Sequence, residues 1–258
     1  MSSIAAVLFD LDGTLYTDAG ALPGAVAALA ELRRRAVPFR YVTNTTRRSR
    51  RLLAERLRGY GFEARPEDIV SAPQACVALL ERRGIRRVAA FLAESTLEDF
   101  AAFDLASETP EVVVVGDLGD AWDFATLNRA FHHLMGGAEL IALQRDRYWL
   151  RADGLALDAG PFVAALEYAT GKTAAVCGKP SVEFYRAAVA ALGARAPAGS
   201  KGVVMVGDDL WGDVEGAQRA GLTAWMVRTG KFRDDVLAQS GIVPDRIIDS
   251  VAALPRLL

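Results

Sequence analysis

The chain has 258 residues, 52% of them hydrophobic, and its 30 Lys and Arg against 32 Asp and Glu give a formal net charge of −2. This near-neutral balance argues against a basic surface for nucleic acid or for an anionic membrane, and no apolar run is long enough to span a bilayer. A chain of this length buries a full core and often divides into two domains.

The N-terminal residues and the small number of cysteines both bear on the cellular compartment of the protein. Met1-Ser2-Ser3 lacks the basic start of a signal peptide. Cys76 and Cys177 are too few for a disulfide framework. We therefore expect a cytoplasmic protein.

The first 71 residues predict strands that alternate with amphipathic helices. The apolar run Ile4–Phe9 is typical of a buried parallel strand, and it ends in Asp10-Leu11-Asp12-Gly13-Thr14. The elements expected next are a helix over Ala25–Arg35, a strand over Phe39–Val42, a helix over Ser49–Tyr60 and a strand over Ile69–Ser71. This order predicts an α/β protein with a doubly wound, mostly parallel sheet.

The middle of the chain predicts a separate α/β unit. Its expected strands are Val88–Leu92, Val112–Val115, Leu140–Leu143 and Tyr148–Leu150, and its expected helices include Phe124–Met135 and Pro161–Ala169. The opening pattern then resumes with a helix over Val182–Leu192 and buried runs over Gly202–Val206 and Ala224–Val227. We therefore predict a discontinuous core of residues 1–71 and 174–258, with a domain of residues 72–173 inserted.

Polar residues follow several expected core strands or lie in loops between core elements: Asp10 and Asp12, Thr43 and Asn44, Lys179, and Asp208 and Asp213. Parallel strands bring their carboxyl ends to one edge of a sheet, so these residues can converge although they are distant in sequence. A few carboxylates, a hydroxyl and one lysine suit Mg²⁺ that shares its ligands with a phosphate. The sequence therefore predicts a magnesium and phosphate site at this edge.

Four motifs, in order, resemble those of the haloacid dehalogenase superfamily: Asp-Leu-Asp-Gly-Thr-Leu at 10–15, Val-Thr-Asn at 42–44, Gly-Lys-Pro at 178–180 and Gly-Asp-Asp-x-x-x-Asp at 207–213. The insertion between the second and third motifs is similar to the cap of the subfamily that contains the NagD-type and p-nitrophenyl phosphatases. Val227-Arg228-Thr229-Gly230-Lys231-Phe232 also resembles this subfamily. The resemblance covers essentially the whole chain and implies a phosphatase.

The resemblance implies how the reaction proceeds. Asp10 would be the nucleophile and would form an aspartyl-phosphate. Asp12 would protonate the leaving oxygen and then accept a proton from the attacking water. Covalent catalysis of this kind divides one displacement into two easier steps.

The resemblance also implies the binding groups. Thr43, Lys179 and the backbone amides around Leu11, Asp12 and Asn44 would hold the phosphoryl group. The metal ligands would be Asp10, the backbone carbonyl of Asp12, and Asp208, with Asp213 holding metal waters or Lys179. Phosphoryl transfer needs chiefly this positioning and charge neutralisation.

Substrate choice is assigned to the insertion, because the core motifs recognise only phosphate. Asp158-Ala159-Gly160 precedes an expected helix, and amides at a helix N-terminus can bind an anionic part of a ligand, so Asp158 is the cap residue predicted to contact substrate. The alternative is that this stretch is an ordinary surface turn. We expect a small phosphorylated metabolite as substrate and no nucleic-acid or membrane partner, and we consider a homodimer formed through the cap.

Other functions remain as alternatives. Cleavage of pyrophosphate or phosphorus–nitrogen bonds is one, although an acid at Asp12 favours phosphate monoesters. A haloacid dehalogenase is disfavoured because a halide leaves without needing a proton or Mg²⁺. A phosphomutase or a scaffold that has kept the fold are further alternatives, and a scaffold is disfavoured because Asp10 and Lys179 are both present.

Overall fold

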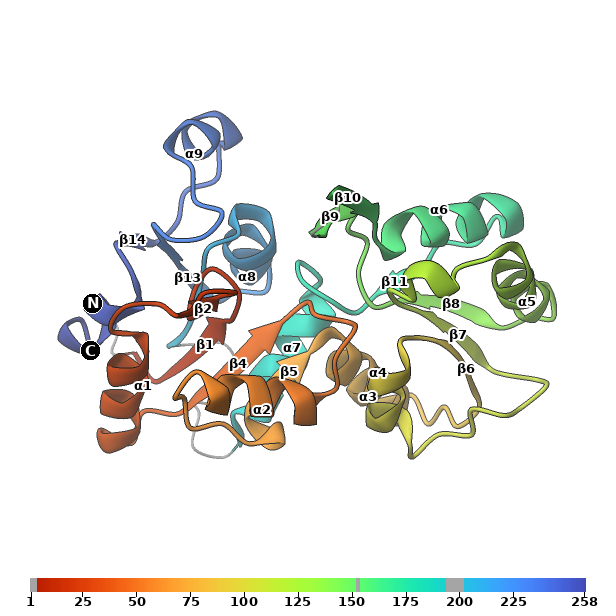
Figure 1. Cartoon of the computed structure of the whole chain (residues 1–258), viewed down its shortest axis with the longest axis horizontal. Coiled ribbons are helices and arrows are strands. Elements are labelled where there is room, and N and C mark those ends of the chain that lie inside the picture. Colours follow the sequence, from red (N-terminus) through yellow and green to blue (C-terminus); the bar gives the residue numbers. More distant parts are fainter. Residues whose placement is uncertain (1–3, 152–153, 194–201) are drawn as a thin grey trace. The chain divides into compact units, whose positions relative to one another are not determined.

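The computed structural model describes the backbone of residues 4–151, 154–193 and 202–258, and the side chains of these residues except 149–151, so Met1–Ser3 lie outside it (Figure 1). The chain divides into two compact units. The first comprises Met1–Thr43, Arg50–Val70 and Lys179–Leu258, and the second comprises Asn44–Ser49 and Ser71–Gly178. The two units are defined by how the residues pack and not by where a domain is inserted. The boundaries of core and insertion that the sequence predicts therefore stay a prediction.

The first unit is built on a six-stranded sheet in the order β14-β13-β12-β1-β4-β5 (Figure 1). Its strands are β1 (Ala6–Asp10), β4 (Phe39–Thr43), β5 (Ile69–Ser71), β12 (Val203–Gly207), β13 (Thr223–Val227) and β14 (Arg246–Ile248). From β14 to β4 every neighbouring pair is parallel. The chain order along the sheet changes direction on either side of β1, which is where open α/β sheets form their ligand sites.

Helices and short turns complete the first unit: α1 (Ala25–Arg34), α2 (Arg50–Gly59), α7 (Val182–Ala191), α8 (Gly216–Arg219), α9 (Asp234–Ser240), the hairpin β2 (Tyr16–Thr17) with β3 (Gly20–Ala21), 3₁₀ turns at Pro66–Asp68 and Val251–Arg256, and a π-helical turn at Leu210–Glu215. Val7 and Phe9 pack in one core with leucines of α1 and α2. Ala6 and Leu8, on the opposite face of β1, are also fully buried. Burial on both faces explains why this strand is apolar throughout.

The second unit has its own parallel four-stranded sheet, in the order β11-β8-β7-β6. The strands are β6 (Val88–Phe91), β7 (Val112–Val115), β8 (Glu139–Ala142) and β11 (Ala175–Val176), and an antiparallel pair is formed by β9 (Tyr148–Arg151) and β10 (Gly154–Leu157). The helices are α3 (Ala72–Arg82), α4 (Glu94–Leu97), α5 (Phe124–Met135) and α6 (Ala159–Thr170), with 3₁₀ turns at Glu98–Phe100 and Gly119–Ala121. Two separate hydrophobic clusters cover the two faces of β7, because Val112 and Val114 belong to one and Val113 and Val115 to the other.

The α/β class and the mostly parallel core sheet predicted from the sequence are confirmed. The short strands β2, β3, β10 and β11 and helix α9 were not predicted, and some element ends differ. Helix α6 begins at Ala159 rather than at Pro161, because the Asp158 carboxylate accepts a hydrogen bond from the Ala159 N–H and starts the helix earlier. In the described parts of the chain, no helix combines the length and the apolar character that a membrane crossing requires.

Candidate functional site

The ends of three adjacent parallel strands bring the first group of predicted site residues together. Asp10 is the last residue of β1, Thr43 is the last residue of β4, and Asp208 follows the last residue of β12. Strand β1 pairs with β4 on one side and with β12 on the other. All three side chains are buried, with exposed fractions of 7%, 3% and 2%. The sheet therefore gathers these polar groups at one edge, as the sequence predicted.

Lys179 lies at the centre of the charged group. Its Nζ is 2.5 Å from Oδ1 of Asp10 and 2.6 Å from Oδ1 of Asp213, and it is itself 7% exposed. Lys179 precedes Pro180, and Ser181 then caps α7 by accepting a hydrogen bond from the Phe184 N–H. One buried ammonium thus joins residues that are 169 and 34 positions away in the chain.

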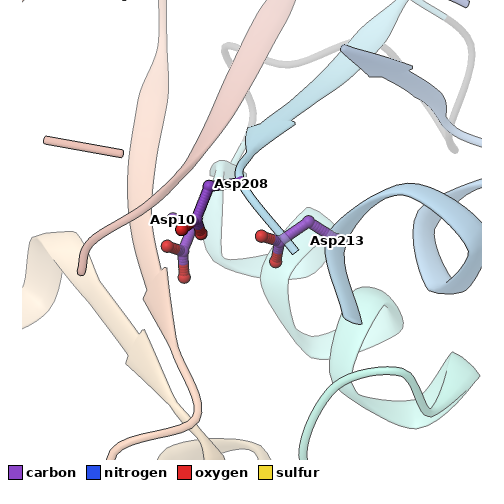
Figure 2. A group of neighbouring side chains, drawn as sticks. All are labelled: Asp10, Asp208 and Asp213. Atoms are coloured by element: carbon purple, nitrogen blue, oxygen red, sulfur yellow. The ribbon is translucent and has the colours of Figure 1, made fainter. Parts of the chain in front are cut away.

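Three buried carboxylates lie close together here, and two of them contact Lys179. Asp10, Asp208 and Asp213 each offer an oxygen within 4.8 Å of the others' oxygens, and Figure 2 shows the three side chains turned toward a common space. Asp213 is fully buried on the π-helical turn after β12, and its Oδ2 accepts a hydrogen bond from the Asp209 N–H at 3.0 Å. The group fits a hard divalent cation because all its ligand atoms are oxygens.

The pKa values of these buried carboxylates show that their negative charge is unfavourable. Burial raises the pKa of Asp10 to about 6, against the opposing charge of Lys179. Burial and then the charge of Asp213 raise the pKa of Asp208 to about 6, and burial raises the pKa of Asp213 to about 7. For Lys179, burial favours the neutral form, but Asp10 and Asp213 outweigh it and raise its pKa well above the usual value. One ammonium against three carboxylates leaves a negative site that a divalent cation would balance.

Asp12 is placed differently from the other acids. Its side chain is exposed, and it does not belong to the group of three carboxylates. The Tyr16 hydroxyl donates to Asp12 Oδ2 at 3.5 Å, and the Arg56 guanidinium lies 4.9 Å from the centre of the Tyr16 ring. An exposed carboxyl beside the buried cluster can exchange protons with solvent. Leu11, between the two acids, is fully buried.

Asn44 and Asp158 belong to the second unit. Asn44 follows Thr43 directly, and its carboxamide packs against Gly178, where an added Cβ would lie 2.7 Å from Asn44 Oδ1. Asp158 is 8% exposed and is the N-cap of α6. Its Oδ1 accepts hydrogen bonds from the Ala159 N–H and from the Gln144 carboxamide. Burial raises the pKa of Asp158.

The structure adds contacts that were not predicted from the sequence. The Lys231 N–H donates to Asp208 Oδ2 at 2.7 Å, and the Lys231 Nζ lies 2.7 Å from Asp209 Oδ2. Lys231 belongs to the run 227–232, which drew attention through resemblance alone and not through any chemical role. A contact made by a backbone N–H leaves no trace in residue type, so the contact of the Lys231 N–H with Asp208 had no sequence signal.

Comparison with known proteins identifies relatives along the whole chain. A family model described as haloacid dehalogenase-like hydrolase matches residues 7–106, and one described as HAD-hydrolase-like matches residues 176–254. The human haloacid dehalogenase-like hydrolase domain-containing protein 2 is 42% identical over 231 residues, covering 90% of this chain and 86% of its own length. The human phospholysine phosphohistidine inorganic pyrophosphate phosphatase is 36% identical over 265 residues, covering 100% of this chain and 95% of its own.

Solved structures with the same fold as this chain include phosphatases. The p-nitrophenyl phosphatase from Archaeoglobus fulgidus superposes with a TM-score of 0.90 at 27% identity, covering 99% of this chain and 100% of that chain. NagD from Escherichia coli K-12 superposes with a TM-score of 0.87 at 26% identity, covering 97% of this chain and 98% of that chain. With these relatives and the four motifs in order, the chain belongs to the haloacid dehalogenase-like hydrolases, in the subfamily of NagD and the p-nitrophenyl phosphatases.

Proposed function

We propose that this protein is a Mg²⁺-dependent phosphatase that hydrolyses a phosphate monoester of a small metabolite through an aspartyl-phosphate. The observation that carries the proposal is the contact of Lys179 with both Asp10 and Asp213, which form one group of carboxylates with Asp208. In this proposal residues 1–71 and 174–258 are the catalytic core, and residues 72–173 are an inserted cap that selects the substrate.

In the first step, an Asp10 carboxylate oxygen attacks phosphorus. The bond between phosphorus and the leaving oxygen breaks, and Asp12 gives that oxygen a proton. The exposure of Asp12 suits this role, because its carboxyl can exchange protons with solvent before substrate binds.

In the second step, water attacks the phosphorus of the aspartyl-phosphate. Asp12, now a carboxylate, accepts a proton from this water, and the bond between phosphorus and Asp10 breaks. Inorganic phosphate leaves and both acids return to their starting states. Each half-reaction thus uses Asp12 once, first as acid and then as base.

Binding of the phosphoryl group is assigned to residues at the same edge. Thr43 and the amides around Leu11, Asp12 and Asn44 would hold its oxygens, and Lys179 would neutralise one of them as a point charge. Asp10, the Asp12 carbonyl and Asp208 would hold Mg²⁺, with Asp213 holding metal waters or Lys179, and the ion would supply positive charge that lets a carboxylate approach a phosphate dianion. The excess negative charge and all-oxygen donors of the buried group support this choice.

The second candidate is hydrolysis of pyrophosphate or of phosphorus–nitrogen bonds. The full-length similarity to the human phospholysine phosphohistidine inorganic pyrophosphate phosphatase favours it. The acid at position 12 favours ordinary monoesters, whose alkoxide leaving groups need a proton. A dehalogenase is less favoured, because it would have no use for the second carboxylate motif. We further propose a cytoplasmic location, no nucleic-acid or membrane partner, and a homodimer through the cap as the oligomer to test.

A panel assay tests the function. Purified protein is stripped of metal with a chelator, and phosphate release is measured from p-nitrophenyl phosphate, sugar and other alkyl phosphates, pyrophosphate and phospholysine. We expect release only after Mg²⁺ is restored, and faster release from one class of monoester than from pyrophosphate or phospholysine. Full activity in the chelator would overturn the metal requirement, and preference for phospholysine or pyrophosphate would favour the second candidate.

A further inference from the structure

The segment Thr229-Gly230-Lys231 follows β13, the strand that pairs with β12. It contacts the two residues that directly follow β12, Asp208 and Asp209. The Lys231 N–H donates to Asp208 Oδ2, and the Lys231 ammonium pairs with Asp209 Oδ2, each at 2.7 Å. A single residue, Lys231, therefore binds two consecutive acids at the carboxyl end of β12.

Gly230 is packed directly against the Asp208 carboxylate. A Cβ added to Gly230 would lie 1.9 Å from Asp208 Oδ2, and one added to Gly13, on the opposite segment, would lie 2.2 Å from the same atom. Both glycines have positive φ, +61° and +81°. The Cα atoms of Gly13 and Gly230 and the Lys231 N–H thus enclose Oδ2. This enclosure fixes the orientation of the Asp208 carboxylate. Any side chain at position 230 would displace it.

Asp209 extends the same support to Asp213. Its Oδ1 accepts hydrogen bonds from the Trp211 and Gly212 N–H groups at 3.1 and 2.8 Å, which starts the turn that carries Asp213. The Asp213 N–H donates to the Asp209 carbonyl at 2.9 Å. The ion pair with Lys231 therefore anchors the turn as well as the strand end. Because the Lys231 side chain is 71% exposed, its contribution is expected to be smaller than that of the contact between Gly230 and the buried Asp208 carboxylate.

We propose that Thr229-Gly230-Lys231 is a positioning segment that fixes the Asp208 carboxylate for the metal ion, with Gly230 as its decisive residue. The inference rests on the metal site of the proposed function. It goes further by assigning the geometry of one ligand to a segment that contributes no ligand itself. Groups that orient metal ligands commonly affect affinity by about 10–100-fold when changed.

The test compares Gly230→Ala with Gly241→Ala in the full chain. Gly241 also lies in the first unit and has φ +72°, but a Cβ there meets nothing within 4 Å. The two changes therefore impose a similar backbone strain, and only Gly230→Ala meets Asp208. Binding of Mn²⁺ to metal-free protein is measured by electron paramagnetic resonance, and folding by circular dichroism. We expect Gly230→Ala to lose about tenfold or more in Mn²⁺ affinity, and Gly241→Ala to stay within about twofold of wild type.

Equal affinity of the two variants would overturn the inference. Absence of Mn²⁺ binding by the wild type would instead overturn the metal site of the proposed function, and the inference with it. If Gly230→Ala does not fold, Lys231→Met decides. Loss of a nearby cation should by charge alone tighten Mn²⁺ binding, whereas loss of an anchor should weaken it by a few-fold. Weaker binding supports the positioning segment, and unchanged or tighter binding overturns it.

Discussion

The two units bury polar side chains in different ways. In the first, Asp10, Lys179 and Asp213 come from distant parts of the sequence and are bound to one another. In the second, Asp117 and Asp158 are also buried, but each has its own partners. Asp117 accepts from the Gly119 N–H and pairs with Arg47, and Asp158 accepts from the Ala159 N–H and the Gln144 carboxamide. Two acids of the first unit thus share one ammonium, whereas each of these acids in the second unit has separate partners.

The difference distinguishes structural polar groups from reactive ones. A side chain that satisfies its own turn or helix start contributes to the fold of that segment. Burial, and then the charge of neighbouring acids, raises the pKa values of Asp10, Asp208 and Asp213. Keeping these carboxylates charged opposes folding, so stability alone would not favour the arrangement. Substitutions should therefore remove activity in the first unit, and alter stability or substrate choice in the second.

The largest effect is expected for Asp10→Asn. The amide keeps the shape of the side chain and can still contact Lys179, but it does not attack phosphorus. Turnover of p-nitrophenyl phosphate should fall by several orders of magnitude, while circular dichroism and thermal unfolding stay close to wild type. A tenth of the wild-type rate remaining in a folded variant would contradict covalent catalysis by Asp10.

Asp12→Ala should have the next largest effect, and it should depend on the leaving group. Removal of a general acid typically costs about 10²–10⁴-fold, and the loss in formation of the phospho-enzyme should be greatest for alkyl phosphates, whose leaving oxygen needs a proton. Single-turnover rates with alkyl and p-nitrophenyl phosphates measure this difference. Asp18→Ala is the control, because Asp18 is a fully exposed acid of the adjacent hairpin turn that pairs with Arg56. Equal losses with both substrates would leave Asp12 without a proton-transfer role.

The smallest effect is expected for Asp158→Ala in the second unit. Loss of the N-cap should destabilise the protein by about 1 kcal/mol, and the substrate ranking should change while p-nitrophenyl phosphate hydrolysis stays within a few-fold. Asp123→Ala is the matched control, because Asp123 caps α5, another 12-residue helix of the same unit, through the Thr126 N–H. It should lower stability by a similar amount and leave the ranking unchanged. If both variants keep the wild-type ranking, Asp158 is a helix cap and nothing more.

Much of the fold and the convergence of the acids could be predicted from sequence, because both follow from strong local signals. An apolar run that ends in Asp10 indicates a buried strand and its open end, and parallel order then brings Thr43 and Asp208 beside it. The start of α6 at Ala159 was missed because Asp158 was interpreted as a ligand group rather than as a cap. The Lys231 contact to Asp208 was missed because a backbone N–H is common to almost every residue.

The most direct test of the account is to trap the phosphorylated enzyme. Asp12→Ala lacks the base of the second step, and p-nitrophenolate leaves without needing an acid in the first. When this variant is mixed with p-nitrophenyl phosphate and Mg²⁺ and quenched in acid, mass spectrometry should find one added phosphoryl group on the peptide that contains Asp10. Reduction of the acyl phosphate with borohydride should then mark Asp10 itself. Steady release of phosphate with no phosphorylated peptide, or a phosphoryl group on another residue, would contradict the central claim.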